Sequence, residues 1–130
     1  HGAATAEDGR SIPIDDTIHH ISRYMWDAYI FMGGRGALLY FDDPHIKKLI
    51  DDIKFKTLGA EGIGTALLAL GGVLSKGKKV TGDYHFAPMI VEHGAEYTGT
   101  PLEIDDKIYT LREPNYAEQF ANAIAQKLES

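Results

Sequence analysis

The sequence contains no cysteine among its 130 residues. Without a thiol the chain can form no disulfide, no thiolate nucleophile and no cysteine-ligated zinc or iron–sulfur site. The sequence also lacks a run of the roughly 18 apolar residues that a membrane-spanning helix needs. We therefore expect no membrane span. The missing cysteines leave the cellular compartment open, because a chain without disulfides is stable in any of them.

Positive charge is scarce. The chain has 13 Lys and Arg against 19 Asp and Glu, which gives a formal net charge of -6. Binding to DNA or RNA depends largely on the neutralisation of phosphates by basic side chains. The charge balance therefore disfavours a general nucleic-acid binder, although a local basic cleft on an acidic protein remains compatible with it.

The composition is that of an ordinary globular protein, with 44% apolar and 25% charged residues. Residues 1–13 are small and polar and show no hydrophobic periodicity, which is typical of a flexible arm or linker. A chain of this size can bury roughly two-thirds of the surface that its unfolded form exposes. We predict a flexible arm over 1–13 and a single domain over 14–130.

Two helices are predicted in the first half of the chain. Apolar residues recur at helical spacing from Asp16 to Met32, and Gly33–Gly34 would end that helix. A second helix begins at Pro44, because proline suits the first helical position and Asp43 before it is a good N-cap. Its apolar face consists of Ile46, Leu49, Ile50 and Ile53.

A third helix is predicted over residues 61–74, a segment that is nearly free of charge. A helix that is apolar all round is either buried or membrane-facing, and this one is too short to span a bilayer. Each glycine in it costs up to ~1 kcal/mol relative to alanine, which favours close packing against another element. As an alternative, residues 62–74 contact a protein partner or a second copy of the chain.

The second half of the chain is predicted to form strands. The segments 80–86 and 89–92 have strand-like composition and are separated near Pro88. Residues 102–104 and 107–111 alternate in polarity around Asp105–Asp106, a pattern that predicts a β-hairpin.

A last helix is predicted to begin at Asn115, just after Pro114. Its apolar face consists of Tyr116, Phe120, Ile124 and Leu128. Together these elements predict an α+β fold in two layers. The N-terminal half is helical, a small antiparallel sheet of roughly three to five strands follows, and the C-terminal helix packs back on the sheet.

Residues 83–97 are the richest part of the sequence in groups that can do chemistry. They hold two of the six histidines, three carboxylates and two tyrosines. In a strand, Asp83 and His85 would lie on one face, because side chains alternate with a period of two. If the segments 80–86 and 89–92 pair as a hairpin, His85 and His93 come close together at its rim.

This rim predicts a set of catalytic residues, namely His85, His93, Glu92, Tyr97 and Arg112. Histidine and glutamate can transfer protons near neutral pH, and a tyrosine with an arginine can stabilise a developing anion. The set suits a metal-independent cleavage of a phosphodiester. The leading hypothesis is therefore a small hydrolase-like domain, a nuclease or a toxin-type effector, that needs no cofactor.

Two other classes of function remain open. In the first, Asp83, His85 and His93 hold a divalent metal such as zinc, which requires ligand atoms within about 2.0–2.3 Å of one point. In the second, the chain is a non-catalytic binding or assembly module with a protein partner or an oligomeric state, and its histidines are scattered. No residue spacing in 83–97 matches a strong motif, so the sequence pattern does not select one of these functions over the others.

Overall fold

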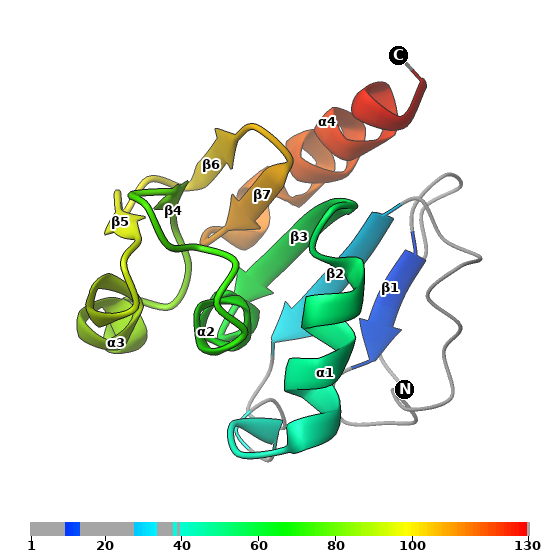
Figure 1. Ribbon diagram of the computed structural model, residues 1–130. Helices are drawn as coiled ribbons and strands as arrows, with labels where there is room; N and C mark the ends of the chain where they lie inside the picture. Colours follow the sequence, from blue (N-terminus) through cyan, green and yellow to red (C-terminus); the bar gives the residue numbers. More distant parts are fainter. Residues whose placement is uncertain (1–9, 14–27, 34–37, 39, 130) are drawn as a thin grey trace.

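The computed structural model describes residues 10–13, 28–33, 38 and 40–129 (Figure 1). The main sheet has five strands in the order β1-β2-β3-β7-β6. These are β1 (Arg10–Pro13), β2 (Ala28–Gly33), β3 (Thr57–Gly62), β7 (Ile108–Leu111) and β6 (Leu102–Asp105). The first four run parallel, and β6 pairs with β7 in the antiparallel sense.

The helices cover both faces of this sheet (Figure 1). They are α1 (Pro44–Ile53), α2 (Gly64–Leu70), α3 (Ala87–Glu92) and α4 (Ala117–Glu129), with short 3-10 turns η4 (Tyr84–Phe86) and η5 (Pro114–Tyr116). A second, two-stranded parallel sheet pairs β4 (Lys79–Val80) with β5 (Glu96–Tyr97). The fold is therefore a layered α/β structure around a mainly parallel sheet.

Two apolar cores flank the main sheet. On one face, α1, α2 and α3 bury a large cluster that includes Phe31, Ile50 and Leu67. On the other face, α4 buries a smaller cluster that includes Ile30 and Phe120. Since β2 sends alternate side chains into both clusters, its sequence is apolar throughout, as is usual for a parallel strand between two helical layers.

The predicted α+β class with an antiparallel sheet is wrong, because the sheet is mainly parallel and its helices alternate with its strands. Residues 28–32, predicted as the end of a helix, form most of β2. The predicted helix over 61–74 is in fact the end of β3 followed by α2. A strand buried on both faces has no period of two, so its apolar run resembles a helix.

Several shorter predictions are confirmed. Helix α1 begins at Pro44, and the Asp43 carboxylate accepts a hydrogen bond from the backbone N–H of His45. The hairpin around Asp105–Asp106 exists as β6 and β7, with Asp106 in the left-handed region at φ +57°. The last helix exists as α4, two residues later than its predicted cap at Asn115.

The N-terminal predictions are only partly covered by the described residues. Residues 10–13, predicted as part of a flexible arm, form β1 and pair with β2. Residues 1–9 and residues 16–27 of the first predicted helix lie outside the described residues. Each helix within the described residues is too short or too polar to span a bilayer.

Helix α2 is enclosed by the chain itself. Six of its residues, from Gly64 to Ala69, are buried, which agrees with the close packing that its small residues predicted. A contact between this segment and a protein partner stays a prediction.

Candidate functional site

The candidate site lies at the carboxyl edge of the sheet, where β3 turns into α2. The strand ends at Gly62, which has φ +59°, and the helix begins two residues later at Gly64. In α/β-hydrolases a strand–turn–helix of this kind presents the catalytic nucleophile. Here the left-handed position is a glycine, so the turn presents backbone and no nucleophilic side chain.

The chain leaving β4 passes directly against this turn. The backbone N–H of Asp83 donates to the Gly62 carbonyl oxygen at 3.2 Å. The Thr65 hydroxyl, from the first turn of α2, donates to the Thr81 carbonyl oxygen at 2.8 Å. These two bonds fix residues 81–83 beside the strand–helix turn.

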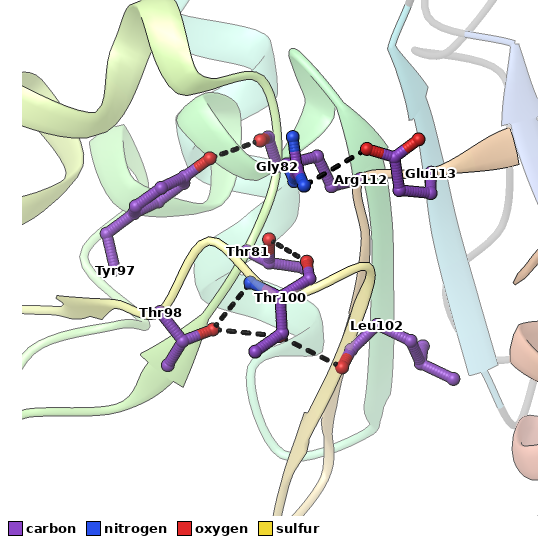
Figure 2. Close-up of polar contacts among 8 residues, drawn as sticks. All are labelled: Thr81, Gly82, Tyr97, Thr98, Thr100, Leu102, Arg112 and Glu113. Carbon is purple, nitrogen blue, oxygen red and sulfur yellow. Dashed lines mark hydrogen bonds and ion pairs between the residues drawn. The ribbon is translucent and has the colours of Figure 1, made fainter.

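The buried residues Thr81 and Thr110 hold the same segment from its other side, and Figure 2 shows the further contact of Thr81 with Thr100. Thr81 and Thr110 are both fully buried, and the Thr81 N–H donates to the Thr110 hydroxyl oxygen at 2.9 Å. The Thr81 hydroxyl donates to the carbonyl oxygen of Thr100. The segment is thereby joined to β7 and to the loop that precedes β6, so the edge of the site is rigid.

Asp83 and His85 form a local pair at this edge. Asp83 is the N-cap of η4, and its Oδ1 accepts from the His85 backbone N–H at 2.9 Å and lies 2.8 Å from His85 Nδ1. The Tyr84 ring stacks on the His85 ring with centroids 4.2 Å apart. The hydrogen bond from the His85 backbone holds the pKa of Asp83 below its usual range, against a smaller opposing effect of burial.

Replacing Asp83 by alanine should destabilise the protein by about 0.5–2 kcal/mol, because the cap of η4 is lost. Asparagine caps as well as aspartate, so Asp83→Asn should cost much less at neutral pH. The lowered pKa of Asp83 means that its charge stabilises the fold above the unfolded-state pKa, and that this stability is lost as the pH falls. Urea denaturation of both variants checks this, and equal losses would contradict the capping role.

Tyr97 and Arg112 both lie next to Gly82, the residue that precedes Asp83 (Figure 2). The Tyr97 hydroxyl donates to the Gly82 carbonyl oxygen at 2.6 Å. Burial raises the pKa of Tyr97; the Thr81 hydroxyl and the Arg112 charge oppose the rise, and the Asp83 charge adds to it. The charges of Arg112 and Asp83 both act on the Tyr97 phenol, so these three side chains lie near one another.

Arg112 follows the last residue of β7 and is only partly exposed. One of its terminal nitrogens lies 3.0 Å from the Glu113 carboxylate. Its Nε is buried and has no hydrogen-bond partner within the described part of the chain. A buried N–H without an acceptor costs roughly 1–3 kcal/mol, so this nitrogen marks a place where an acceptor would be favourable.

Glu61 is a second unpaired group at the edge, on the α4 face of the sheet. Its strand partners in the register are Met32 and Leu111. No hydrogen bond or ion pair joins its half-buried carboxylate to any described residue. Burial accordingly raises the pKa of Glu61 above its ordinary value.

Glu61→Gln should stabilise the protein at neutral pH. The pKa of Glu61 is higher in the folded state than in the unfolded chain, so on raising the pH the unfolded chain releases the Glu61 proton first. The free energy of unfolding of the wild type therefore falls as the pH rises above the unfolded-state pKa of this carboxyl. Glutamine has no such loss, and the advantage of the variant should grow between about pH 4 and pH 7. Urea denaturation at both pH values tests it, with the exposed Glu92→Gln as a control for the lost charge. A constant difference would contradict the expectation.

The predicted hairpin between residues 80–86 and 89–92 is wrong, because residues 84–92 are the helical turns η4 and α3. Pro88 falls in the first turn of α3, where proline is favoured. His85 lies in η4 and His93 is the C-cap of α3, so the two histidines are at opposite ends of these helical turns and do not face each other across a hairpin. His93 Nδ1 lies 2.8 Å from the carbonyl oxygen of Met89, and Glu92 is exposed.

The predicted catalytic residues are therefore split into two groups. The first group lies near Gly82 and consists of Tyr97, Arg112 and the pair Asp83–His85. The second group, Glu92 and His93, lies at the end of α3. The metal site predicted from Asp83, His85 and His93 is not formed. Across the described residues, no three His, Asp or Glu side chains are grouped closely enough to hold a metal ion.

Comparison with known proteins identifies the fold. The sequence model of the DJ-1/PfpI family matches residues 1–127, which is nearly the whole chain. The chain belongs to the DJ-1/PfpI family. The α/β layering described above is the flavodoxin-like arrangement of these proteins.

Several individual proteins are similar to this chain in sequence or in fold. The protein MJ0967 of Methanocaldococcus jannaschii is 27% identical over 128 residues, which cover 93% of this chain and 61% of that protein. A two-domain protein with DJ-1/ThiJ/PfpI-like and ferritin-like domains from Anabaena variabilis has a TM-score of 0.78 at 25% identity, over 85% of this chain and 32% of that one. A putative protease I from Bacteroides thetaiotaomicron has a TM-score of 0.70 at 19% identity, over 82% of this chain and 64% of that one.

DJ-1/PfpI membership overturns the leading functional hypothesis. The chain is not a nuclease or a toxin-type effector, since its sequence and fold belong to this other family. The chain spans less than two-thirds of the length of MJ0967. The activity and partners of a whole protein of this kind are accordingly matters for proposal.

The centre of the site carries no clear sequence pattern. Gly62 and Glu61 were assigned to a helix, and Thr81 and Thr110 were passed over as ordinary strand residues. A signal for the turn was present, because Gly62-Ile63-Gly64 stands between a short apolar run and a helical one. The threonine contacts join residues 29 positions apart, and no local pattern encodes them.

Proposed function

We propose that this DJ-1/PfpI domain binds a small molecule with an anionic oxygen at the carboxyl edge of its sheet, and that no covalent bond to the protein forms. Open α/β sheets bind ligands outside the carboxyl ends of their strands. The observation that carries the proposal is the buried Nε of Arg112, which has no acceptor from the described residues.

The chemistry of Arg112 selects the kind of ligand. A guanidinium presents its N–H groups in a planar fork that matches the two oxygens of a carboxylate or phosphate. Its contact with Glu113 occupies one terminal nitrogen. A ligand oxygen that reaches the Nε edge, directly or through a water molecule, would satisfy the remaining donor.

Tyr97 supports the same class of ligand. The ordinary pKa of tyrosine is about 10, and burial raises the pKa of Tyr97 further, so the phenol is neutral near neutral pH and places no negative charge beside Arg112. The nearby Asp83 carboxylate would repel an anion, but its Oδ1 is engaged by the His85 backbone and ring. The unpaired donor at Arg112 Nε is therefore the group that favours an acceptor oxygen here.

The glycine at the turn supports binding without a covalent step. Acyl transfer through an enzyme intermediate needs a nucleophilic side chain next to a base. Gly62 offers none, and the whole chain contains no cysteine. The putative protease I from Bacteroides thetaiotaomicron shares the fold at 19% identity. A similarity of fold at this identity does not imply a peptidase mechanism at Gly62.

Titration of the isotope-labelled protein with acetate, benzoate and inorganic phosphate tests the proposal by NMR. We expect saturable shifts at Thr81, Tyr97 and Arg112 for at least one anion. Arg112→Gln should weaken that binding at least tenfold, about 1.4 kcal/mol, and Arg112→Lys should recover it only in part. The matched control Lys48→Gln removes an exposed cation of α1 and should change nothing.

Two outcomes contradict the proposal. The first is a set of shifts spread over surface lysines and unaffected by Arg112→Gln, because the anions would then bind only as counterions. The second is a stable mass increase of the intact protein after exposure to an activated acyl ester, traced by peptide mapping to the carboxyl edge. That increase would reveal a nucleophile that the geometry does not provide.

A further inference from the structure

A pocket of about 340 Å³ lies between the start of α1 and the second half of α2, apart from the carboxyl-edge site. Ligand pockets range over roughly 300–1,000 Å³, so this one suits a small metabolite better than a large cofactor. Its wall is apolar and partly aromatic, formed by Tyr40, Phe41, Pro44, Ile46, Leu67 and Leu70. None of its lining residues belongs to the site around Gly62.

Local contacts hold the wall in place. The Asp43 cap and Pro44 fix the start of α1, and Ile46 is buried beneath it. The Phe41 ring meets the Phe86 ring edge-on, with centroids 5.5 Å apart. The pocket is therefore bounded by packed rings and a capped helix end, as a preformed ligand site is.

Two opposite charges lie at the pocket margin. Asp42 and Lys47 both line it and both are exposed. Within the described residues neither side chain has a hydrogen bond or an ion-pair partner. The other carboxylate of the lining, Asp43, is already engaged as the cap of α1. The pocket thus offers one available anion and one available cation above an apolar wall.

We propose that this pocket binds a zwitterionic amino acid with an apolar side chain. The ligand ammonium would pair with Asp42 and its carboxylate with Lys47, while its side chain contacts the apolar wall around Ile46, Leu67 and Leu70. The charge pattern argues for one ligand with both signs, because such a ligand can pair with Asp42 and Lys47 at once, whereas an amine or an acid alone can pair with only one of them. The proposal is independent of the anion site at Arg112, with which the pocket shares no residue.

The experiment uses three probes that differ only in charge, namely L-phenylalanine, phenethylamine and 3-phenylpropanoate. Binding to the labelled protein is followed by NMR at the methyl groups of Ile46, Leu67 and Leu70. L-Phenylalanine should bind saturably, and each analogue at least tenfold more weakly. Asp42→Asn and Lys47→Gln should each weaken L-phenylalanine at least tenfold, whereas Lys48→Gln, which lies outside the pocket, should not.

The variants also separate the two charge contacts. Asp42→Asn should abolish the preference for L-phenylalanine over 3-phenylpropanoate, and Lys47→Gln the preference over phenethylamine, as in a double-mutant cycle. All three substitutions are at exposed positions, and the near-UV circular dichroism spectrum checks that each variant folds. Equal affinity for the three probes, no saturable shift, or shifts at Tyr97 and Arg112 in place of the pocket would each overturn the proposal.

Discussion

Gly64→Ala is expected to destabilise the protein by about 3 kcal/mol or more, the upper range for forced overpacking. A Cβ at this position would overlap the carbonyl oxygen of Phe31, far closer than real side chains approach a backbone oxygen. The first turn of α2 and the strand β2 are both backbone at this contact, so neither can move aside as a flexible side chain could. The helix would have to shift away from the sheet and open the core.

The free energy of unfolding from urea denaturation measures this effect. Gly72→Ala is the matched control, because a Cβ there meets nothing within 4 Å and only the left-handed φ of +84° is strained. That strain costs about 1–2 kcal/mol. If Gly64→Ala fails to give soluble protein while Gly72→Ala folds, the destabilisation by the Cβ at position 64 is large enough to prevent folding, as expected. Equal stability of the two variants would show that α2 does not pack on β2 as described.

Phe120→Ala is expected to cost about 3–5 kcal/mol, the usual range for removing a buried phenylalanine. Phe120 is 5% exposed and lies with Ile124 in the core between α4 and the sheet. Both rest over Gly59 of β3, the glycine whose missing side chain leaves them room. Truncation would leave a cavity under the only helix that covers this face within the described residues.

Tyr116→Ala provides the comparison for an aromatic truncation near the same helix. Tyr116 was predicted to share the buried face with Phe120, but it lies in η5 and is 39% exposed. Tyr116→Ala should lower the free energy of unfolding by less than about 1 kcal/mol, because the Tyr116 side chain buries little apolar surface in the folded protein. Thermal or urea denaturation of both variants decides the question. A larger loss for Tyr116 would mean that α4 is rotated relative to the arrangement described here.

The elements that were predicted correctly carry their own local signals. Helix α1 has an aspartate cap, a proline in its first turn and apolar residues at helical spacing. The β6–β7 hairpin has two adjacent aspartates at its turn, and Asp106 takes the left-handed conformation that such a turn requires. Helix α4 is long enough for its periodicity to be clear. In each case residues within a few positions of one another determine the structure.

The elements that were predicted wrongly depend on contacts with distant residues. Strand β2 is buried by α1 and α2 on one face and by α4 on the other, so its apolar residues show no alternation. Strand β3 contains Gly59 because Phe120 and Ile124 of α4 lie directly over this position, and it ends at Gly62, whose φ is +59°. Residues 84–92 have strand-like side chains, yet Asp83 and Pro88 start helical turns there.

The sequence by itself determined which chemistry is excluded by the lack of cysteine and which elements have local caps and turns. It also singled out Asp83, Tyr97 and Arg112, because charged and phenolic side chains are recognisable wherever they lie. Only the tertiary structure decided that these three lie together at one edge, beside a glycine in place of a nucleophile. The reason is physical: parallel strands and the buried Thr81–Thr110 contact join segments tens of residues apart, and local propensity carries no information about such pairs.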